Sequence, residues 1–394
     1  MDLLQLLTEC VKRSASDLHL KSASRPILRV HGHLETQDDL PPVTRDFMRK
    51  TAMNMLGELR YNALMEGEEM DLGHTAPGIG RFRINLFLCQ GDVRAVLRHI
   101  PEHIPAFEGL HLPKVLERLC QERRGLILVT GITGSGKSTT LAAMLDYMNR
   151  TRNDHIVTIE DPVEFVHEDK KCVISQREIG QDSTSFAQAL RAALREDPDI
   201  ILVGEMRDAE TMEVALHAAE TGHLVLSTLH TLNATETINR VISTFPPHQE
   251  DQIRDQLASV MQGIVSQRLV VRADGKGRVP AVEVMVGTGL IRDSIRSSEK
   301  TSNIPTVIAA GQAQYGMQTF DQSLLQLHRG ELITYETARD AATNPDDFDL
   351  KVKGILSTGE MTWDAGASDA VPPPAAATTS VSHAEAESSP FRKR

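Results

Sequence analysis

The chain has 394 residues, of which 40% are hydrophobic and 24% are charged, and its formal net charge is -12 at pH 7. This length exceeds what one hydrophobic core normally serves, so we expect two domains, and no apolar run approaches the roughly 20 residues that a membrane-spanning helix needs. The acidic balance argues against a protein whose main surface binds nucleic acid, because such a surface needs a concentrated basic face.

The first 100 residues mix predicted helices and strands. Residues 1–13 carry apolar side chains on one helical stripe, which we interpret as an amphipathic helix of the mature protein. We predict a strand in each of residues 16–22 and 26–35, a helix in residues 42–67, and a hairpin in residues 80–100. These elements together predict an α+β domain over residues 1–100.

Residues 101–113 contain three prolines, which disfavour both a helix interior and a central strand. We interpret this stretch as an extended connector that permits hinge motion between two domains. At the other end, residues 365–394 have almost no large apolar side chains, so this tail is predicted to be disordered.

Residues 114–360 show a different pattern, in which short apolar runs alternate with amphipathic helices. Four such runs, GLILV, HIVTI, DIILV and HLVLS, are typical of strands that are buried on both faces. The alternation predicts an α/β domain with a mostly parallel sheet.

The first of these runs leads into GITGSGKS, residues 131–138, which fits the phosphate-binding pattern GxxxxGK[ST] at every fixed position. Glycines let backbone N–H groups turn inward around phosphate, and the helix that follows adds the positive end of its dipole. In this pattern Lys137 supplies charge to the β and γ phosphates, and Ser138 offers its hydroxyl to Mg²⁺. The predicted ATP-binding residues are Gly131, Thr133, Gly134, Ser135, Gly136, Lys137, Ser138 and Thr139.

Acidic residues end two further strands. Glu205 follows residues 200–203 and is our candidate for the acid beside Mg²⁺, so the predicted metal ligands are Ser138 and Glu205. Glu160, Asp161 and Glu164 follow residues 156–159. Spacing alone leaves open whether one of these three orients the attacking water or whether they form an acidic loop around a proline turn.

Two histidines bracket the fourth strand. His223 and His230 would lie at opposite ends of it, too far apart to bind one metal ion. A contact of His230 with nucleotide or with a neighbouring subunit is favoured over metal ligation, and a structural histidine stays open.

These motifs, in this order and together with ASDLHL at residues 15–20, resemble the secretion ATPase superfamily, and specifically its PilT/PilU branch of type IV pilus retraction ATPases. TGITGSGKST is similar to the Walker A motif of that family, TIEDPVEFVH to its Asp box, REDPDIILVGEMRD to its Walker B motif, and AETGHLVLSTLHT to its His box. The match covers about residues 1–350. Extension motors share the four boxes but resemble longer chains that carry a tetracysteine motif, which this chain lacks.

The resemblance implies a PAS-like N-terminal domain joined to a RecA-like motor domain, in a homohexameric ring that hydrolyses ATP with Mg²⁺. It implies Glu164 as general base, Glu205 at the metal ion, and His230 as the sensor of the γ-phosphate. It also implies arginines that reach nucleotide from the N-terminal domain, which we assign to Arg83 and Arg98 and expect to act across a subunit boundary.

For partners, the resemblance implies an inner-membrane pilus platform protein and allows a paralogous retraction ATPase, with no nucleic acid and no direct membrane insertion. The implied location is cytoplasmic, at the inner face of the membrane. An auxiliary PilU-like ring partner stays an alternative to the principal motor, because residues 289–295 keep only part of the family motif there. A nucleic-acid translocase on the same core is disfavoured by the acidic balance.

Overall fold

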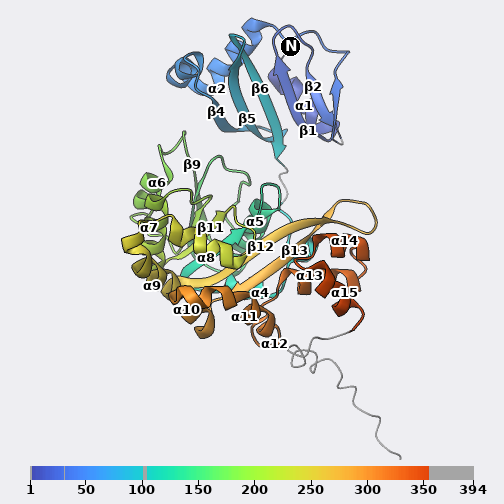
Figure 1. Cartoon of the computed structure of the whole chain (residues 1–394). Helices are drawn as coiled ribbons and strands as arrows, with labels where there is room; N and C mark the ends of the chain where they lie inside the picture. Colours follow the sequence, from blue (N-terminus) through green and yellow to red (C-terminus); the bar gives the residue numbers. More distant parts are fainter. Residues whose placement is uncertain (1, 31, 101–103, 355–394) are drawn as a thin grey trace, which may run out of the picture. The chain divides into compact units, whose positions relative to one another are not determined.

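The computed structural model describes residues 2–30, 32–100 and 104–354. In these residues the strands form two sheets, each with helices of its own (Figure 1). No helix in the described part of the chain is both long and apolar enough to cross a bilayer.

The first sheet is antiparallel throughout and belongs to the N-terminal part. Its strand order is β3-β2-β1-β6-β5-β4, with β1 (Ala15–Lys21), β2 (Ile27–Val30), β3 (His33–Thr36), β4 (Met70–Ala76), β5 (Gly80–Cys89) and β6 (Asp92–Ile100). Phe82, Ile84 and Leu86 of β5 are buried and the residues between them are not, which is the pattern of a sheet with one covered face. Helices α1 (Leu3–Lys12) and α2 (Arg45–Met65) contribute to the same apolar core.

The prediction of a single strand over residues 26–35 was wrong. The segment forms two strands, in which Val30 pairs with His33 in a tight reversal. Gly32 has a φ of +87°, a backbone conformation that glycine adopts without strain and that lets the chain turn back here. Strand β4 was not predicted.

The second sheet is the α/β sheet that the alternating apolar runs predict. Its order is β13-β12-β7-β11-β10-β8-β9, with β7 (Gly125–Thr130), β8 (His155–Glu160), β9 (Val173–Glu178), β10 (Ile200–Val203), β11 (Leu224–Leu229), β12 (Met261–Val271) and β13 (Arg278–Val286). The strands from β12 to β9 are parallel, and β13 pairs antiparallel with β12.

Both faces of this sheet are covered, and β7 shows how. Leu126 and Leu128 enter one apolar core, whereas Ile127 and Val129 enter the core on the opposite face. The first core includes α6 (Phe186–Ala193), α7 (Ala209–Glu220), α8 (Ala234–Ser243), α9 (Glu250–Val260), α10 (Gly289–Arg296) and α11 (Ile304–Ala310), and the second includes α4 (Val115–Leu119) and α5 (Lys137–Thr151). Burial on both sides explains why these strands are almost wholly apolar.

A smaller cluster of helices covers the end of the β12–β13 hairpin (Figure 1). It consists of α13 (Phe320–Arg329), α14 (Tyr335–Ala341) and α15 (Pro345–Val352), and α12 (Gln312–Tyr315) precedes it. Two short 3-10 helices, η1 (Pro247–Gln249) and η2 (Ser298–Asn303), complete the described elements.

The predicted connector is only partly described, because residues 101–103 lie outside the described residues. Within the rest, α3 (Phe107–Leu110) is helical, so a wholly extended connector was wrong. Phe107 is buried and its ring lies 5.3 Å from that of Tyr147 on α5, which ties this segment to the second sheet's core. The predicted tail, residues 365–394, and residues 355–360 also lie outside the described residues.

Candidate active site

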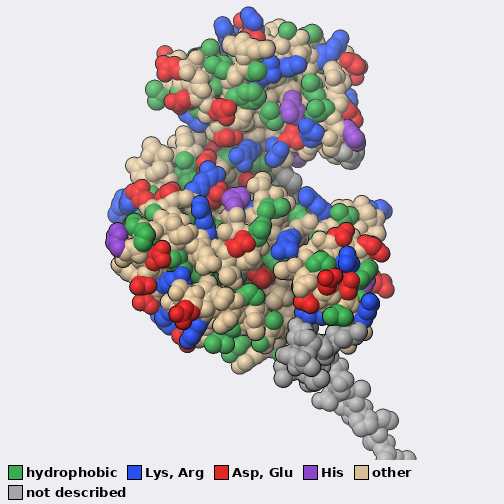
Figure 2. Space-filling model, in the orientation of Figure 1, with side chains coloured by type: hydrophobic (Ala, Val, Ile, Leu, Met, Phe, Trp, Pro, Cys, Tyr) green, Lys and Arg blue, Asp and Glu red, His purple; other side chains and the backbone are tan. Residues whose placement is uncertain are grey.

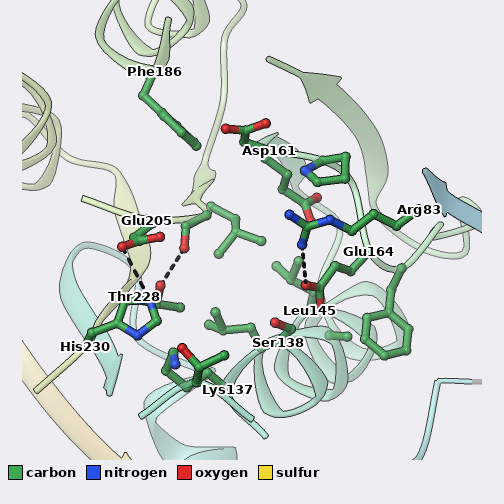
Figure 3. Close-up of a pocket in the computed structure, with 18 of the residues that line it drawn as sticks. Arg83, Lys137, Ser138, Leu145, Asp161, Glu164, Phe186, Glu205, Thr228 and His230 are labelled. Atoms are coloured by element: carbon green, nitrogen blue, oxygen red, sulfur yellow. Dashed lines mark hydrogen bonds and ion pairs between the residues drawn. The ribbon is translucent and has the colours of Figure 1, made fainter. Parts of the chain in front are cut away.

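Four strands of the α/β sheet end at a cavity of about 360 Å³. Its walls come from the loop after β7, from the carboxyl ends of β8, β10 and β11, and from one face of α5 (Figure 3). Crevices at the carboxyl ends of strands are where open α/β sheets bind ligands.

The loop after β7 needs glycine for steric reasons. A Cβ atom on Gly131 would lie 2.5 Å from both the Gln267 carbonyl oxygen and the Ser135 Oγ. Gly134 and Gly136 have φ values of +78° and +94°, which L side chains rarely adopt. The loop can therefore approach a ligand closely with its backbone.

Lys137 is buried at the first turn of α5 and points its ammonium group at its own loop. Its Nζ donates to the carbonyl oxygens of Gly131, at 2.9 Å, and Ile132, at 3.1 Å. Burial lowers the pKa of Lys137, whereas the charges of Glu205 and Glu164 act to raise it.

Other groups of the loop suit phosphate. The hydroxyl of Ser135 is buried and has no hydrogen-bond partner among the described residues. No side chain caps the N-terminus of α5, so its first N–H groups can serve an anion. Of the eight predicted ATP-binding residues, Thr133, Gly134, Lys137 and Ser138 line the cavity, and Gly131, Ser135, Gly136 and Thr139 belong to the adjoining loop and first helical turn.

Glu205 lies at the end of β10 and faces two basic side chains. Its Oε2 lies 2.8 Å from Arg207 Nη2. Its Oε1 lies 3.4 Å from His230 Nε2 (Figure 3). Burial acts to raise the pKa of this carboxyl, but the hydrogen bond and charge of Arg207, with smaller effects of His230 and Lys137, hold it below its ordinary value.

The cavity contains oxygen donors for a metal ion. Ser138 and Glu205 both line it, as predicted for Mg²⁺ ligands. The His, Cys, Asp and Glu side chains of the described residues form no group of three or more that could hold a metal ion by themselves. That donor set fits Mg²⁺, which protein sites often hold by one or two side chains together with substrate phosphates and water.

Glu160 is the most enclosed carboxyl of the cavity. It accepts hydrogen bonds from Thr158 Oγ1 at 2.7 Å, from Gln176 Nε2 at 3.2 Å, and from the backbone of Glu164. Burial raises the pKa of Glu160 to about 7, although these hydrogen bonds act to lower it. Burial also raises the pKa of Asp161. A protonated Glu160 relieves the crowding of three carboxyl groups in one loop.

The two predicted arginines behave differently. Arg83 lines the cavity, with its Nη1 4.0 Å from Glu164 Oε1 (Figure 3). Arg98 does not line it, and its Nε donates to Asp17 Oδ1 at 2.9 Å. Within this chain, therefore, only the first of the two arginines is brought to the predicted catalytic carboxylates.

The histidines at the two ends of β11 are separated as expected. His230 lines the cavity beside Thr228, whose hydroxyl donates to the carbonyl oxygen of Gly204 at 2.7 Å. His223, at the other end, contacts the carbonyl oxygen of Ala218 through its Nδ1 and does not line the cavity.

Sequence reasoning missed three residues at or near this site. Arg207 lies two positions after Glu205 in GEMRD, and this short spacing could have predicted that the two side chains are close. Gln176 and Glu178 lie on β9, an edge strand without a continuous apolar run, so the pattern of the sequence offered no signal for them.

The sequence and the fold of this chain are similar to those of known proteins. Residues 2–303 match the family model described as type II/IV secretion system protein. The chain is 46% identical over 348 residues to the type IV pilus retraction ATPase PilT of Pseudomonas aeruginosa, which covers 88% of this chain and 100% of that one. It is 39% identical over 353 residues to the type IV pilus ATPase PilU of the same organism, which covers 90% and 92%. The crystal structure of the pilus retraction motor PilT with bound ADP is 44% identical, with a TM-score of 0.79 over 88% of this chain and 98% of that one.

Proposed function

The chain belongs to the type II/IV secretion system family, in its branch of type IV pilus retraction ATPases, and from this premise we propose that it is a Mg²⁺-dependent ATPase motor that powers pilus retraction. One observation carries the enzymatic part of this proposal. A phosphate-binding loop, an acid at the end of β10 and an acidic loop at the end of β8 all face one cavity.

We assign phosphate binding to the loop and to the start of α5. Lys137 turns from its loop carbonyls toward the β and γ phosphates, and the free N–H groups of α5 and the Ser135 hydroxyl supply further donors. ATP thus replaces contacts that the loop makes with itself. When bound with ATP, Mg²⁺ supplies charge that stabilises the transferring phosphoryl group, with Ser138 and Glu205 as its protein ligands.

We assign water activation to Glu164 and γ-phosphate sensing to His230. Glu164 is more exposed than Glu160, its carboxylate has no hydrogen bond to another described side chain, and it faces Arg83, so this carboxylate is free to accept a proton from water. His230 contacts Glu205, which lets a change at the metal side reach β11. Arg83 supplies positive charge to the transition state.

We further propose a homohexameric ring that acts in the cytoplasm at the inner face of the membrane, on an inner-membrane pilus platform protein. The relationship to PilT and PilU supports this assembly, and it makes a paralogous retraction ATPase a further partner. Figure 2 shows Lys and Arg side chains interspersed with Asp and Glu over the face it presents, which suits protein contacts better than nucleic acid. The higher identity to PilT favours the principal motor over an auxiliary ring partner.

A cellular experiment tests the motor assignment. A bacterium that assembles type IV pili but lacks its own retraction ATPase should regain pilus retraction and twitching when it produces this chain, and should not regain them with Lys137→Ala. Retraction that also requires a second ATPase would identify the auxiliary role. No rescue by a well-expressed wild-type chain would count against the motor assignment.

A further inference from the structure

The loop that follows β8 is held in place by two side chains of one edge strand. Residues 176 and 178 of β9 are two positions apart, so their side chains leave the same face of the strand. This face meets the loop of residues 160–168, which carries the proposed base. None of the motifs that identify the family includes either residue.

Gln176 makes the first of these two attachments and uses both ends of its amide. Its Nε2 donates to Glu160 Oε1 at 3.2 Å and to the Phe165 carbonyl oxygen at 2.9 Å. Its Oε1 accepts from the His167 backbone N–H at 2.8 Å. Three points of the loop are therefore fixed by one side chain.

Glu178 makes the second attachment, and it is buried. It accepts from the backbone N–H groups of Val163, at 3.3 Å, and Gly73, at 2.9 Å, and from Arg81 Nη2, also at 2.9 Å. Arg81 in turn donates from Nε to the Val163 carbonyl oxygen at 3.0 Å. Gly73 has no room for a side chain here, because a Cβ would lie 2.6 Å from Glu178 Oε2. The attachment joins the loop to strands β4 and β5.

Glu164 stands between the two attachments. Its neighbours Val163 and Phe165 are each held through the backbone, whereas its own side chain is 40% exposed and, among the described residues, has one ion-pair contact, the 4.0 Å approach to Arg83. The position of its carboxylate is thus set by the backbone of the loop rather than by partners of the carboxylate.

We propose that Gln176 and Glu178 are positioning residues, which hold Glu164 at the place where it orients and deprotonates the attacking water. This inference rests on the proposed ATPase function. Because a displacement of about 1 Å in a reacting group can lower a rate by about 100-fold, loss of an attachment should reduce turnover without removing the groups that bind ATP.

The test compares Gln176→Ala with Arg177→Ala in the assembled full-length protein. Arg177 is the matched control, because it lies between the two residues on the same strand and pairs with Glu196 at 2.8 Å instead of with the loop. For each protein, kcat and KM for ATP are measured, together with the Kd of a fluorescent ATP analogue. We expect Gln176→Ala to lower kcat by roughly 10- to 100-fold with Kd within about threefold of wild type, and Arg177→Ala to stay within about twofold in both.

Further variants of Gln176 and Glu178 test how kcat depends on the hydrogen bonds that each side chain makes. Gln176→Glu keeps an acceptor for His167 but loses both donors, so its kcat should also fall. Glu178→Gln keeps one acceptor oxygen and the size of the side chain but loses the charge opposite Arg81, so it should fold and retain more activity than Glu178→Ala, with KM unchanged.

Equal kcat values for Gln176→Ala and Arg177→Ala would overturn the inference, and so would a loss of ATP affinity that matches the loss of kcat. These outcomes differ from a failure of the proposed function. In that case the wild-type ring would hydrolyse no ATP, and no variant would change the rate.

Discussion

Arg207 Nη2 and Glu205 Oε2 form an ion pair across 2.8 Å at the edge of the cavity. The contact matters because burial alone would raise the pKa of Glu205, and an acid beside Mg²⁺ must be ionised. Arg207 therefore favours the charged form of Glu205, and its position also restricts where the carboxylate points.

Removal of this arginine should impair turnover. We expect Arg207→Ala to lower kcat roughly tenfold, because Glu205 loses the partner that orients it while Lys137 still binds phosphate. Steady-state ATPase assays measure the effect. Arg191→Ala is the control, since Arg191 forms an ion pair of the same 2.8 Å length with Glu210 on the exposed surface, where such pairs matter little. An Arg207→Ala protein as active as this control would show that Arg207 does not act on Glu205.

Substitutions of Glu164 and Glu160, both at or just after the end of β8, should show which of the two is the general base. Glu164→Gln should bind ATP normally and lower hydrolysis by roughly 10²- to 10⁴-fold, because a neutral amide cannot accept the proton of water. Single-turnover assays with radiolabelled ATP would detect bound, unhydrolysed nucleotide. If Glu164→Gln still hydrolyses ATP and Glu160→Gln does not, the base is Glu160.

The raised pKa of Glu160 also predicts how stability depends on pH. Its ordinary pKa is 4.5 and its pKa in the folded chain is about 7, so the folded state binds this proton more tightly than the unfolded state. The stabilisation is fully present below about pH 4.5 and is lost as pH rises through about 7. At roughly 1.4 kcal/mol per pH unit, the loss amounts to about 3 kcal/mol.

Glu160→Gln removes this dependence, because an amide does not titrate. The stability of the variant relative to wild type should therefore be greater at pH 8 than at pH 5. Thermal unfolding of both proteins at both pH values measures this change. Glu283, whose pKa burial also raises to about 7, is present in both proteins and cancels in the comparison. A difference that stays constant with pH would contradict a raised pKa for Glu160.

Arg83 offers a test of which subunit completes the site. Arg83→Ala should lower turnover by about 10³-fold if it stabilises the transition state. Because the structure has Arg83 at the cavity of its own chain, mixed rings of inactive Arg83→Ala and inactive Lys137→Ala subunits should stay inactive. Recovery of ATPase activity in such rings would instead assign Arg83 to the neighbouring subunit, as expected from the sequence.

The sequence was most informative where strands are buried on both faces. Strands β7, β8, β10 and β11 have continuous apolar runs, and each predicted motif lies at the end of one of them. The predicted α/β class and the resemblance to pilus retraction ATPases are confirmed by the close match to PilT. Because the carboxyl ends of parallel strands lie at the same edge of the sheet, the residues that follow these strands are expected to lie close together.

It was least informative where contacts join distant parts of the chain. Strand β12 carries the buried polar residues Ser266 and Gln267, whose partners Thr130 and Thr140 come from more than a hundred residues away. The local pattern of apolar and polar residues does not predict such pairs. The same holds for Gln176 and Glu178, and for Arg98, where only the fold shows that the side chain turns to Asp17.

The most direct test of the account is the ATPase rate of the purified, assembled protein compared with that of Lys137→Ala. The substitution removes the ammonium group that the loop after β7 holds at the cavity, and the carbonyl oxygens around it cannot replace its charge at the phosphates. We predict that the wild-type ring hydrolyses ATP and that Lys137→Ala, with the same mass in solution, loses nucleotide binding or turnover. Turnover of Lys137→Ala within about twofold of wild type would contradict the assignment of this cavity as the site of ATP hydrolysis.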